Sequence, residues 1–405
     1  MEALENSGVS TNIASFLGAT TARMMEVGFE NRPATENEMQ KMREMVKQSM
    51  EEGAMGIGSS LIYAPADYAP TEELVELCRV AAEKGGMYIS HMRNEDNLLM
   101  EALEELITIS READIPAEIY HLKASREVNW HMLDSLIKRV EQVREEGLEI
   151  TADIYTYNAS STGLTGVIPT WVQEGGHRAW INRMKDPKIR PRLLNDIRKQ
   201  LAEQPPEGIL MVGFNNPEMS KKYLAKTIAE AASIRGQSPE EAIVDMVIED
   251  DSRIQCIYFS MSEENIRKKI QLPWVSFCSD AGSYSDISKS FRTHPRAFGS
   301  FIRVLGKYSR DEELISLAEA IRKLSGFPAK NLKIKNRGLL KEGYFADVVM
   351  FDANKVNDSA TFDEPLQFST GVAHVVVNGT PVLLNSKHTN KFTGRYVKGP
   401  GYIEQ

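Results

Sequence analysis

Two histidines and two aspartates follow or end apolar, strand-like runs of the sequence. His91 ends MYISH, His121 follows IPAEIY, Asp153 lies within LEITADIY, and Asp280 follows WVSFC. The first three are each about 30 residues apart, which is the length of one strand–helix unit. Imidazole and carboxylate groups are good zinc ligands, and a carboxylate beside an activated water can accept its proton. The spacing predicts a water-activating metal site that includes His91, His121 and Asp280.

Each of these residues has a plainer interpretation when it is considered alone. A single strand-end histidine is more often a hydrogen-bonded structural residue than a metal ligand, and Asp153 could simply orient its neighbours. The metal interpretation therefore depends on the pair of histidines at one strand–helix spacing together with a later aspartate. The histidines in other contexts are predicted to be structural: His131, His177, His374 and His388.

The elements that position these residues alternate in type between residues 54 and 157. Short apolar runs are separated by amphipathic stretches such as TEELVELCRVAAEKGG and NLLMEALEELITISREAD. Strands that alternate with helices of 10 to 15 residues are typical of a parallel sheet built from βαβ units. We predict an α/β fold of the (β/α)8 TIM-barrel type, in which the carboxyl ends of the strands meet on the face that carries active sites.

Three further polar residues are expected on the same face. Lys123 and Tyr155 follow or end two of these strands, and both could bind a carboxylate, Lys123 through its charge and Tyr155 through its hydroxyl. A salt bridge or a surface position would explain either residue equally well. Arg296, in the run THPRAF after Asp280, could bind a carboxylate through two parallel hydrogen bonds.

The remainder of the chain divides into an insertion and a terminal module. The regular alternation stops between residues 158 and 256, and this helix-rich segment is predicted to be an elaborated loop over the active site, within a catalytic domain of residues 1–330. Residues 331–405 show short alternating strands with an Asn378-Gly379 hairpin turn, which predicts a small β module.

The composition excludes several classes of protein. The formal net charge is −9, with charges of both signs interspersed, so no basic surface for nucleic acid is expected. The sequence has three scattered cysteines, no signal-like N-terminus and no apolar run of the ~18 residues that a membrane span needs. We predict a cytoplasmic protein that acts on a small molecule, while the oligomeric state is left open.

An ordered set of motifs resembles a known family. GAMGIGSSLIYAP, YISHMRNE, IYHLKAS, EITADIYTYNASST, FCSDAG, THPRAFGSF and RGLLKEGYFADVVMFD follow one another as they do in the D-aminoacylase, or N-acyl-D-amino-acid deacylase, branch of the amidohydrolases. The resemblance spans nearly the whole chain. It implies a zinc-dependent barrel enzyme that hydrolyses the amide of N-acyl-D-amino acids to a carboxylate and a D-amino acid.

The resemblance also implies roles for particular residues. His91 and His121 match the zinc-binding histidines of two consecutive strands, and Asp280 matches the catalytic aspartate of the last strand. The matches to substrate-binding positions are Tyr63, Lys123, Tyr155, Ser161 and Arg296. The preferred D-side chain and the number of metal ions are not implied.

One departure from the family pattern concerns its first strands. The family's first strand ends in a His-x-His pair and its second supplies a further ligand, commonly cysteine, whereas this sequence has no His-x-His and its first strand-like run, NIASFLGAT, resembles the third. The interpretation is that the first strands are missing, by at least two βα units. The absence of these strands favours an alternative in which this chain alone is poorly soluble and inactive.

A second alternative is a cyclic amide hydrolase of the hydantoinase type. Such enzymes usually carry a carboxylated lysine on the strand before the two histidines. No lysine fills that place in GAMGIGSSL.

Overall fold

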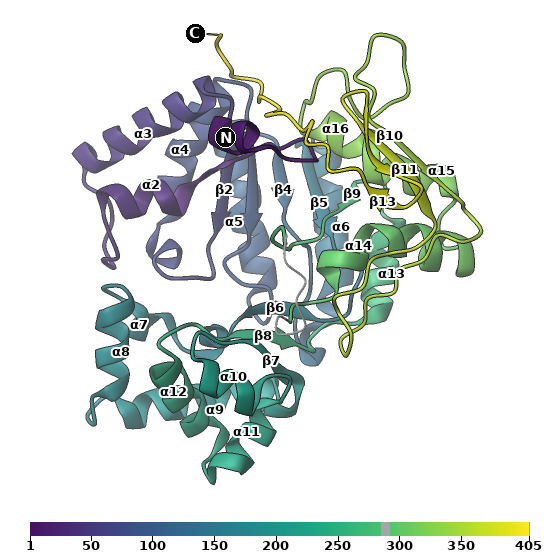
Figure 1. The fold of residues 1–405 in the computed structure, drawn as a ribbon. Coiled ribbons are helices and arrows are strands. Elements are labelled where there is room, and N and C mark those ends of the chain that lie inside the picture. Colours follow the sequence, from purple (N-terminus) through teal and green to yellow (C-terminus); the bar gives the residue numbers. More distant parts are fainter. Residues whose placement is uncertain (285–291, 405) are drawn as a thin grey trace.

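The centre of the protein is a parallel sheet of six strands (Figure 1). The computed structural model describes residues 1–284 and 292–404. The sheet order is β1-β2-β3-β4-β5-β9. The strands are β1 (Leu17–Gly18), β2 (Gly56–Ser60), β3 (Met87–His91), β4 (Ala117–Ile119), β5 (Ile150–Ile154) and β9 (Val275–Phe277). Strands β1 to β5 lie side by side in chain order, which is the order found in barrels built from repeated βα units.

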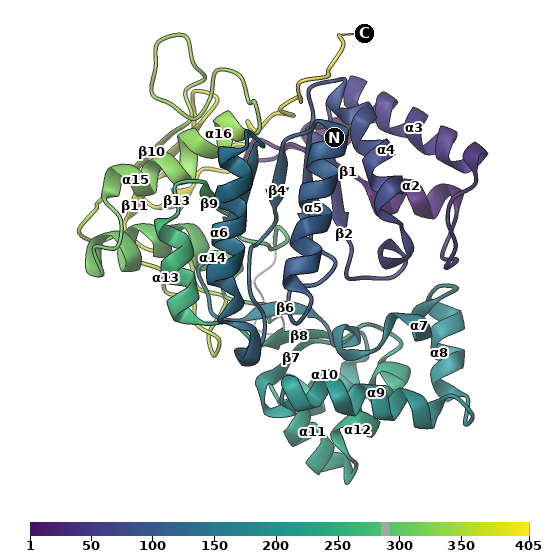
Figure 2. The ribbon, with the colours of Figure 1, turned by 180° about the vertical axis from the view of Figure 1, so that it is seen from behind.

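Helices connect these strands and cover one face of the sheet. They are α2 (Ala19–Glu26), α3 (Glu36–Glu51), α4 (Thr71–Ala82), α5 (Leu99–Ala113), α6 (Met132–Glu145) and α13 (Glu263–Gln271). Figure 2 shows α5, α6 and α13 along this face. Helix α3 begins with a capping box, in which Thr35 and Glu38 satisfy each other's backbone N–H groups. Crossovers between neighbouring parallel strands are almost always right-handed, which places their helices on the same side of a sheet.

The two faces of the strands differ in chemistry because side chains alternate along a strand. Residues that face the helices are apolar and buried, including Ile119, Ile150 and Ile154. The opposite face carries Glu118 paired across β4 and β5 with Thr151. The Thr151 hydroxyl donates to a Glu118 carboxylate oxygen (2.7 Å). Burial, followed by the charge of Asp153, raises the pKa of Glu118. The face of the sheet opposite the helices therefore carries polar side chains.

A second unit lies next to the carboxyl ends of the parallel strands (teal in Figure 1). It contains an antiparallel sheet in the order β6-β8-β7, formed by β6 (Ser160–Gly163), β7 (Ile209–Gly213) and β8 (Gln255–Tyr258). Its helices are α7 (Thr170–Gln173), α8 (His177–Lys185), α9 (Arg190–Glu203), α10 (Pro217–Tyr223), α11 (Ile228–Arg235) and α12 (Pro239–Asp250). These elements enclose a hydrophobic core of their own, which includes Leu193, Ile209 and Ile243. The unit occupies the segment predicted as an insertion.

The chain ends in a small antiparallel sheet of β10 (Val348–Phe351), β11 (Val372–Val377), β12 (Thr380–Leu384) and β13 (Lys387–His388). The predicted hairpin turn is confirmed, since Asn378 (φ 50°) and Gly379 (φ 82°) join β11 to β12. Helices α14 (Arg296–Arg303), α15 (Leu317–Ile321) and α16 (Phe327–Asn331) precede this module. The C-terminal segment contacts the N-terminal segment, where the Ile13 N–H donates a hydrogen bond to the carbonyl of Arg395. Helix α1 (Glu2–Ser7) lies at the N-terminus.

The predicted parallel α/β architecture with a small C-terminal β module is confirmed. The described part of the main sheet has six strands, with β1 and β9 at its two edges, compared with eight in a complete barrel. Within the described residues, no helix combines the length and the apolar character that crossing a membrane would require.

Candidate active site

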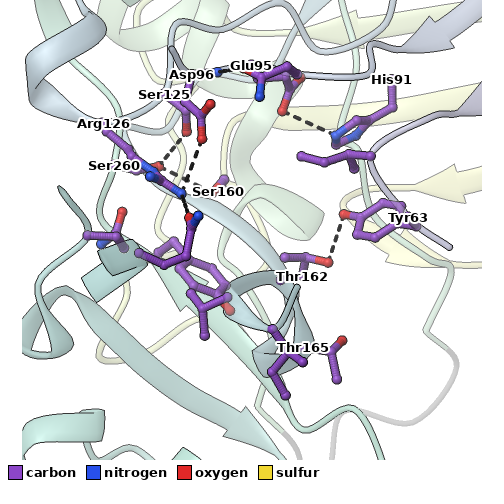
Figure 3. A pocket seen from close by; sticks show the side chains of 18 of the residues that line it. Tyr63, His91, Glu95, Asp96, Ser125, Arg126, Ser160, Thr162, Thr165 and Ser260 are labelled. Atoms are coloured by element: carbon purple, nitrogen blue, oxygen red, sulfur yellow. Dashed lines mark hydrogen bonds and ion pairs between the residues drawn. The ribbon is translucent and has the colours of Figure 1, made fainter. Parts of the chain in front are cut away.

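A pocket of about 730 Å³ lies between the carboxyl ends of the parallel strands and the second unit. The strand ends contribute His91, His121, Lys123, Tyr155 and Asp280 to its wall, and the second unit contributes residues of β6, α7 and α9. Figure 3 shows His91 and Tyr63 on one side of this pocket and Asp96 and Arg126 across from them. The topology therefore gathers the predicted residues into one cavity.

The two histidines predicted as metal ligands are in direct contact. His91 is the last residue of β3, and its Nδ1 lies 2.8 Å from Nε2 of His121. His121 follows β4 in the left-handed region (φ 41°), where a non-glycine residue needs support. Asp153 supplies that support, because its carboxylate accepts the His121 backbone N–H at 2.6 Å. The interpretation that Asp153 orients its neighbours agrees with this contact.

A third potential ligand, Glu95, was missed by the sequence analysis. Its two carboxylate oxygens lie 3.3 Å from Nε2 of His91 and 3.2 Å from Nδ1 of His121. Potential donor atoms of these three residues all lie within 4.8 Å of one another. Glu95 comes four residues after His91, in the loop that leaves the strand, and this proximity in YISHMRNE was the available signal.

Burial and neighbouring groups shift pKa values within this cluster of His91, Glu95 and His121. Burial opposes the ionisation of Glu95, but the contacts of its carboxylate with His91, Lys123 and His121 outweigh it and hold the pKa of this carboxyl well below its usual range. Burial lowers the pKa of His91 well below its ordinary value, against the opposing charge of Glu95. The cluster therefore presents an ionised carboxylate and a neutral imidazole, which are the protonation states that metal binding needs.

The donor set fits a zinc ion. Two imidazoles and a carboxylate are a common set for catalytic zinc, which leaves a position for water or substrate. Nε2 of His91 is buried and faces the Glu95 carboxylate at 3.3 Å without a hydrogen bond of good geometry. The ammonium of Lys123 lies between two of the donor atoms, 2.7 Å from Oε1 of Glu95 and 2.6 Å from Nδ1 of His121. The site thus already accommodates a positive charge.

Asp280 and Arg296 form an ion pair on another part of the pocket wall. Nη1 of Arg296 lies 2.5 Å from Oδ2 of Asp280, which follows β9 in the left-handed region (φ 46°). The Arg296 guanidinium lies over the ring of Tyr155, 4.5 Å from its centroid, and is 94 % removed from solvent. Its Nε has no hydrogen-bond partner among the described residues. A buried guanidinium with an unused donor is suited to bind an anion.

The predicted hydroxyl groups lie around the pocket and already have partners. The Tyr155 hydroxyl donates to the sulfur of Met261 (3.2 Å), and burial raises its pKa well above the ordinary value. Ser161 donates to the carbonyl of Cys256 (2.8 Å). Tyr63 shares a hydrogen bond with Thr162 (2.8 Å), and its ring centroid lies 5.4 Å from that of His91. Binding a substrate carboxylate through Tyr155 or Ser161 therefore requires their hydroxyls to exchange partners.

Another histidine, His294, supports the arginine. Its Nε2 lies 2.8 Å from the carbonyl of Ala159, and its Nδ1 accepts the backbone N–H of Arg296 at 3.0 Å. Burial lowers the pKa of His294 well below its usual value, so the ring is neutral. The four histidines predicted to be structural do not line this pocket.

The fold and the site define the class of protein. The sequence profile of the amidohydrolase family matches residues 12–383, and the chain belongs to this family. Its relatives place it in the D-aminoacylase branch. It is 31 % identical over 395 residues to a D-aminoacylase of Alcaligenes xylosoxydans xylosoxydans, an alignment that covers 98 % of this chain and 72 % of the relative.

Solved structures agree with this placement. An N-acyl-D-glutamate deacylase from Bordetella bronchiseptica, complexed with zinc and a phosphonate that mimics the tetrahedral intermediate, is 29 % identical with a TM-score of 0.79 over 96 % of this chain and 71 % of that chain. A D-aminoacylase described as having a binuclear metal centre is 30 % identical with a TM-score of 0.81, covering 98 % of this chain and 74 % of that chain. A D-hydantoinase from Bacillus sp. AR9 (13 % identity, TM-score 0.51, 97 % of this chain and 82 % of that chain) shares the fold alone.

Proposed function

We propose that the protein hydrolyses the amide bond of N-acyl-D-amino acids with the help of zinc, releasing a carboxylate and a free D-amino acid. The observation that carries this proposal is that one pocket holds both the His91–Glu95–His121 cluster and the Asp280–Arg296 ion pair. The substrate has the complementary pair of features, a scissile amide and a nearby carboxylate. The relatives described above act on substrates of this kind.

Each group has a proposed role. His91, His121 and Glu95 hold the metal, which when bound supplies Lewis acidity to water and to the amide carbonyl. Asp280 accepts a proton from the attacking water and delivers it to the leaving nitrogen. The carboxylate of the substrate is held by Arg296 and Lys123, with Tyr63, Tyr155 and Ser161 lining its place. In this scheme residues 1–330 form the catalytic domain, the segment 158–256 covers the site, and residues 331–405 form the accessory β module.

The direct test is hydrolysis by the zinc-loaded protein. N-acetyl-D-methionine, its L enantiomer and hydantoin are compared under the same conditions. We expect cleavage of the D compound, with kcat/KM at least ~10² above that of the L compound, because the fixed carboxylate and amide positions allow one configuration to reach the metal. Cleavage of hydantoin without cleavage of the acyl amino acid would favour the cyclic amide alternative, and cleavage of none of the three would contradict the proposal.

Arg296 is expected to recognise the carboxylate of the substrate. Replacing it with alanine removes the buried donors that face the pocket, so KM for N-acetyl-D-methionine should rise ~10-fold or more. The matched probe is N-acetyl-D-methionine amide, which lacks the negative charge and whose KM should change little. As a control, Arg111→Ala removes an exposed guanidinium paired with Glu146. An equal increase in KM for both compounds would mean that Arg296 acts only through Asp280.

A further inference from the structure

A buried lysine that has no part in the proposed mechanism contacts the turn after β4. Lys269 lies on α13 and is only 1 % exposed. Helix α13 lies next to α6 on the helical face of the main sheet, where Lys268 pairs with Asp134 of α6 (Figure 2). Lys269 shares the buried side of α13 with Ile266 and Ile270, which belong to the hydrophobic core. This side of an amphipathic helix ordinarily carries apolar residues.

The Lys269 amine has one hydrogen-bond acceptor among the described residues. Its Nζ donates to the carbonyl of Leu122 at 2.6 Å, and no described carboxylate forms an ion pair with it. Burial, followed by the positive charge of Lys123, lowers the pKa of Lys269 to about 7. The amine can donate this hydrogen bond in either protonation state. Because burying an amine without a charged partner is unfavourable, packing alone does not explain a lysine at this position.

The carbonyl that Lys269 contacts lies between two residues of the active site. Leu122 follows His121 and precedes Lys123, and both of these neighbours line the pocket. The side chain of Leu122 itself is buried in the hydrophobic core. All three residues come after the last residue of β4, Ile119, so the pairing of that strand does not hold them. A movement of the Leu122 peptide group would therefore displace both neighbours.

The backbone of this turn is held by β5 and by α13. Asp153 of β5 accepts the His121 N–H with its carboxylate (2.6 Å) and the Leu122 N–H with its backbone carbonyl (2.9 Å). Lys269 of α13 donates to the carbonyl of Leu122, which receives no other hydrogen bond from the described residues. A buried carbonyl without a donor is unfavourable. Without the amine, the turn would relax to find another partner for this carbonyl.

We propose that Lys269 is a positioning residue for the active site, because its hydrogen bond to Leu122 fixes the places of His121 and Lys123 in the pocket. Lys269 does not line the pocket, so it acts through the turn and touches neither the metal nor the substrate. This inference rests on the proposed function in one respect, which is that His121 is taken as a zinc ligand.

The test replaces Lys269 with methionine, which has a similar length and no donor. We expect the zinc affinity, measured by competition with a chromophoric chelator, to fall ~10-fold, as it does when a group that orients a metal ligand is removed. The Tm of the metal-free protein should change little, because removal of a buried amine offsets the loss of its hydrogen bond. Lys269→Gln keeps an N–H donor and should recover part of the affinity.

The matched control is Lys323→Met. Lys323 is also fully buried, and its Nζ donates to the carbonyls of Ile270 and Leu272 (2.7 Å for Leu272) at the end of α13. This substitution removes a buried amine from the same region but leaves the turn after β4 intact, so the zinc affinity should not change. An equal fall in the two methionine variants, or an unchanged zinc affinity in Lys269→Met, would overturn the inference.

Failure of the proposed function can be recognised separately. If the parent protein binds zinc but hydrolyses no N-acyl-D-amino acid, the proposed function fails and the zinc affinities still decide the inference. If the parent protein binds no zinc, amide hydrogen exchange of the Leu122 N–H in the metal-free proteins decides it. Faster exchange in Lys269→Met but not in Lys323→Met would support the inference, and faster exchange in both variants or in neither would refute it.

Discussion

Replacing His121 with alanine is expected to lower the zinc affinity of the protein by at least ~10², because one of three protein donors is lost. The remaining donors, on His91 and Glu95, come from a single strand end and its loop. They cannot enclose an ion without the imidazole from the next strand. Zinc content after dialysis, and competition with a chromophoric chelator, measure the effect without reference to enzyme activity.

The backbone at this position requires a second variant. His121 has a positive φ, which alanine adopts with strain of ~1 kcal/mol or more, whereas asparagine tolerates it. His121→Asn therefore separates the loss of a ligand from the loss of local structure, and it should show the same drop in affinity with an unchanged Tm of the metal-free protein. His131→Ala, at the exposed start of α6, is the matched control. Zinc content equal to that of the parent protein in both His121 variants would rule out the proposed ligand role.

The sequence was sufficient to predict the parallel sheet and the convergence of its strand ends. This succeeds because hydrophobic periodicity and unit length are local properties, and because the carboxyl ends of parallel strands necessarily lie on one side. His91 and His121 could be paired for this reason alone. Their direct contact through Nδ1 and Nε2 follows from the adjacent places of β3 and β4 in the sheet.

The parts of the site that could not be predicted depend on loops and on long-range partners. Glu95 reaches the histidines through the turn after β3, and no periodic pattern reports the path of such a turn. Lys123 lines the pocket, and the contacts of its ammonium with Glu95 and His121 could not be read from the sequence. The contact of Arg253 with Tyr63 joins positions far apart in the sequence. Contacts of this kind are set by tertiary packing.

Asp280→Asn is expected to reduce kcat by ~10² or more while zinc remains bound, because asparagine keeps the size of the side chain but cannot accept a proton. The substitution suits the backbone, since asparagine tolerates the positive φ of this position (46°). It replaces a charged partner of Arg296 with a neutral one, so the substrate carboxylate meets less competition for the guanidinium. We therefore expect KM to stay the same or fall.

A combination of lower kcat, unchanged zinc content and unchanged or lower KM is specific to a proton-transfer role for Asp280. A purely structural role would instead raise KM and lower Tm, because Arg296 would lose the group that positions it. Asp134→Asn, which removes an exposed carboxylate paired with Lys268, controls for the loss of one negative charge. Near-normal turnover of Asp280→Asn would mean that another group accepts the proton. Glu95 would then be the next carboxylate to test, since it lies within 3.3 Å of both histidine rings and lines the same pocket.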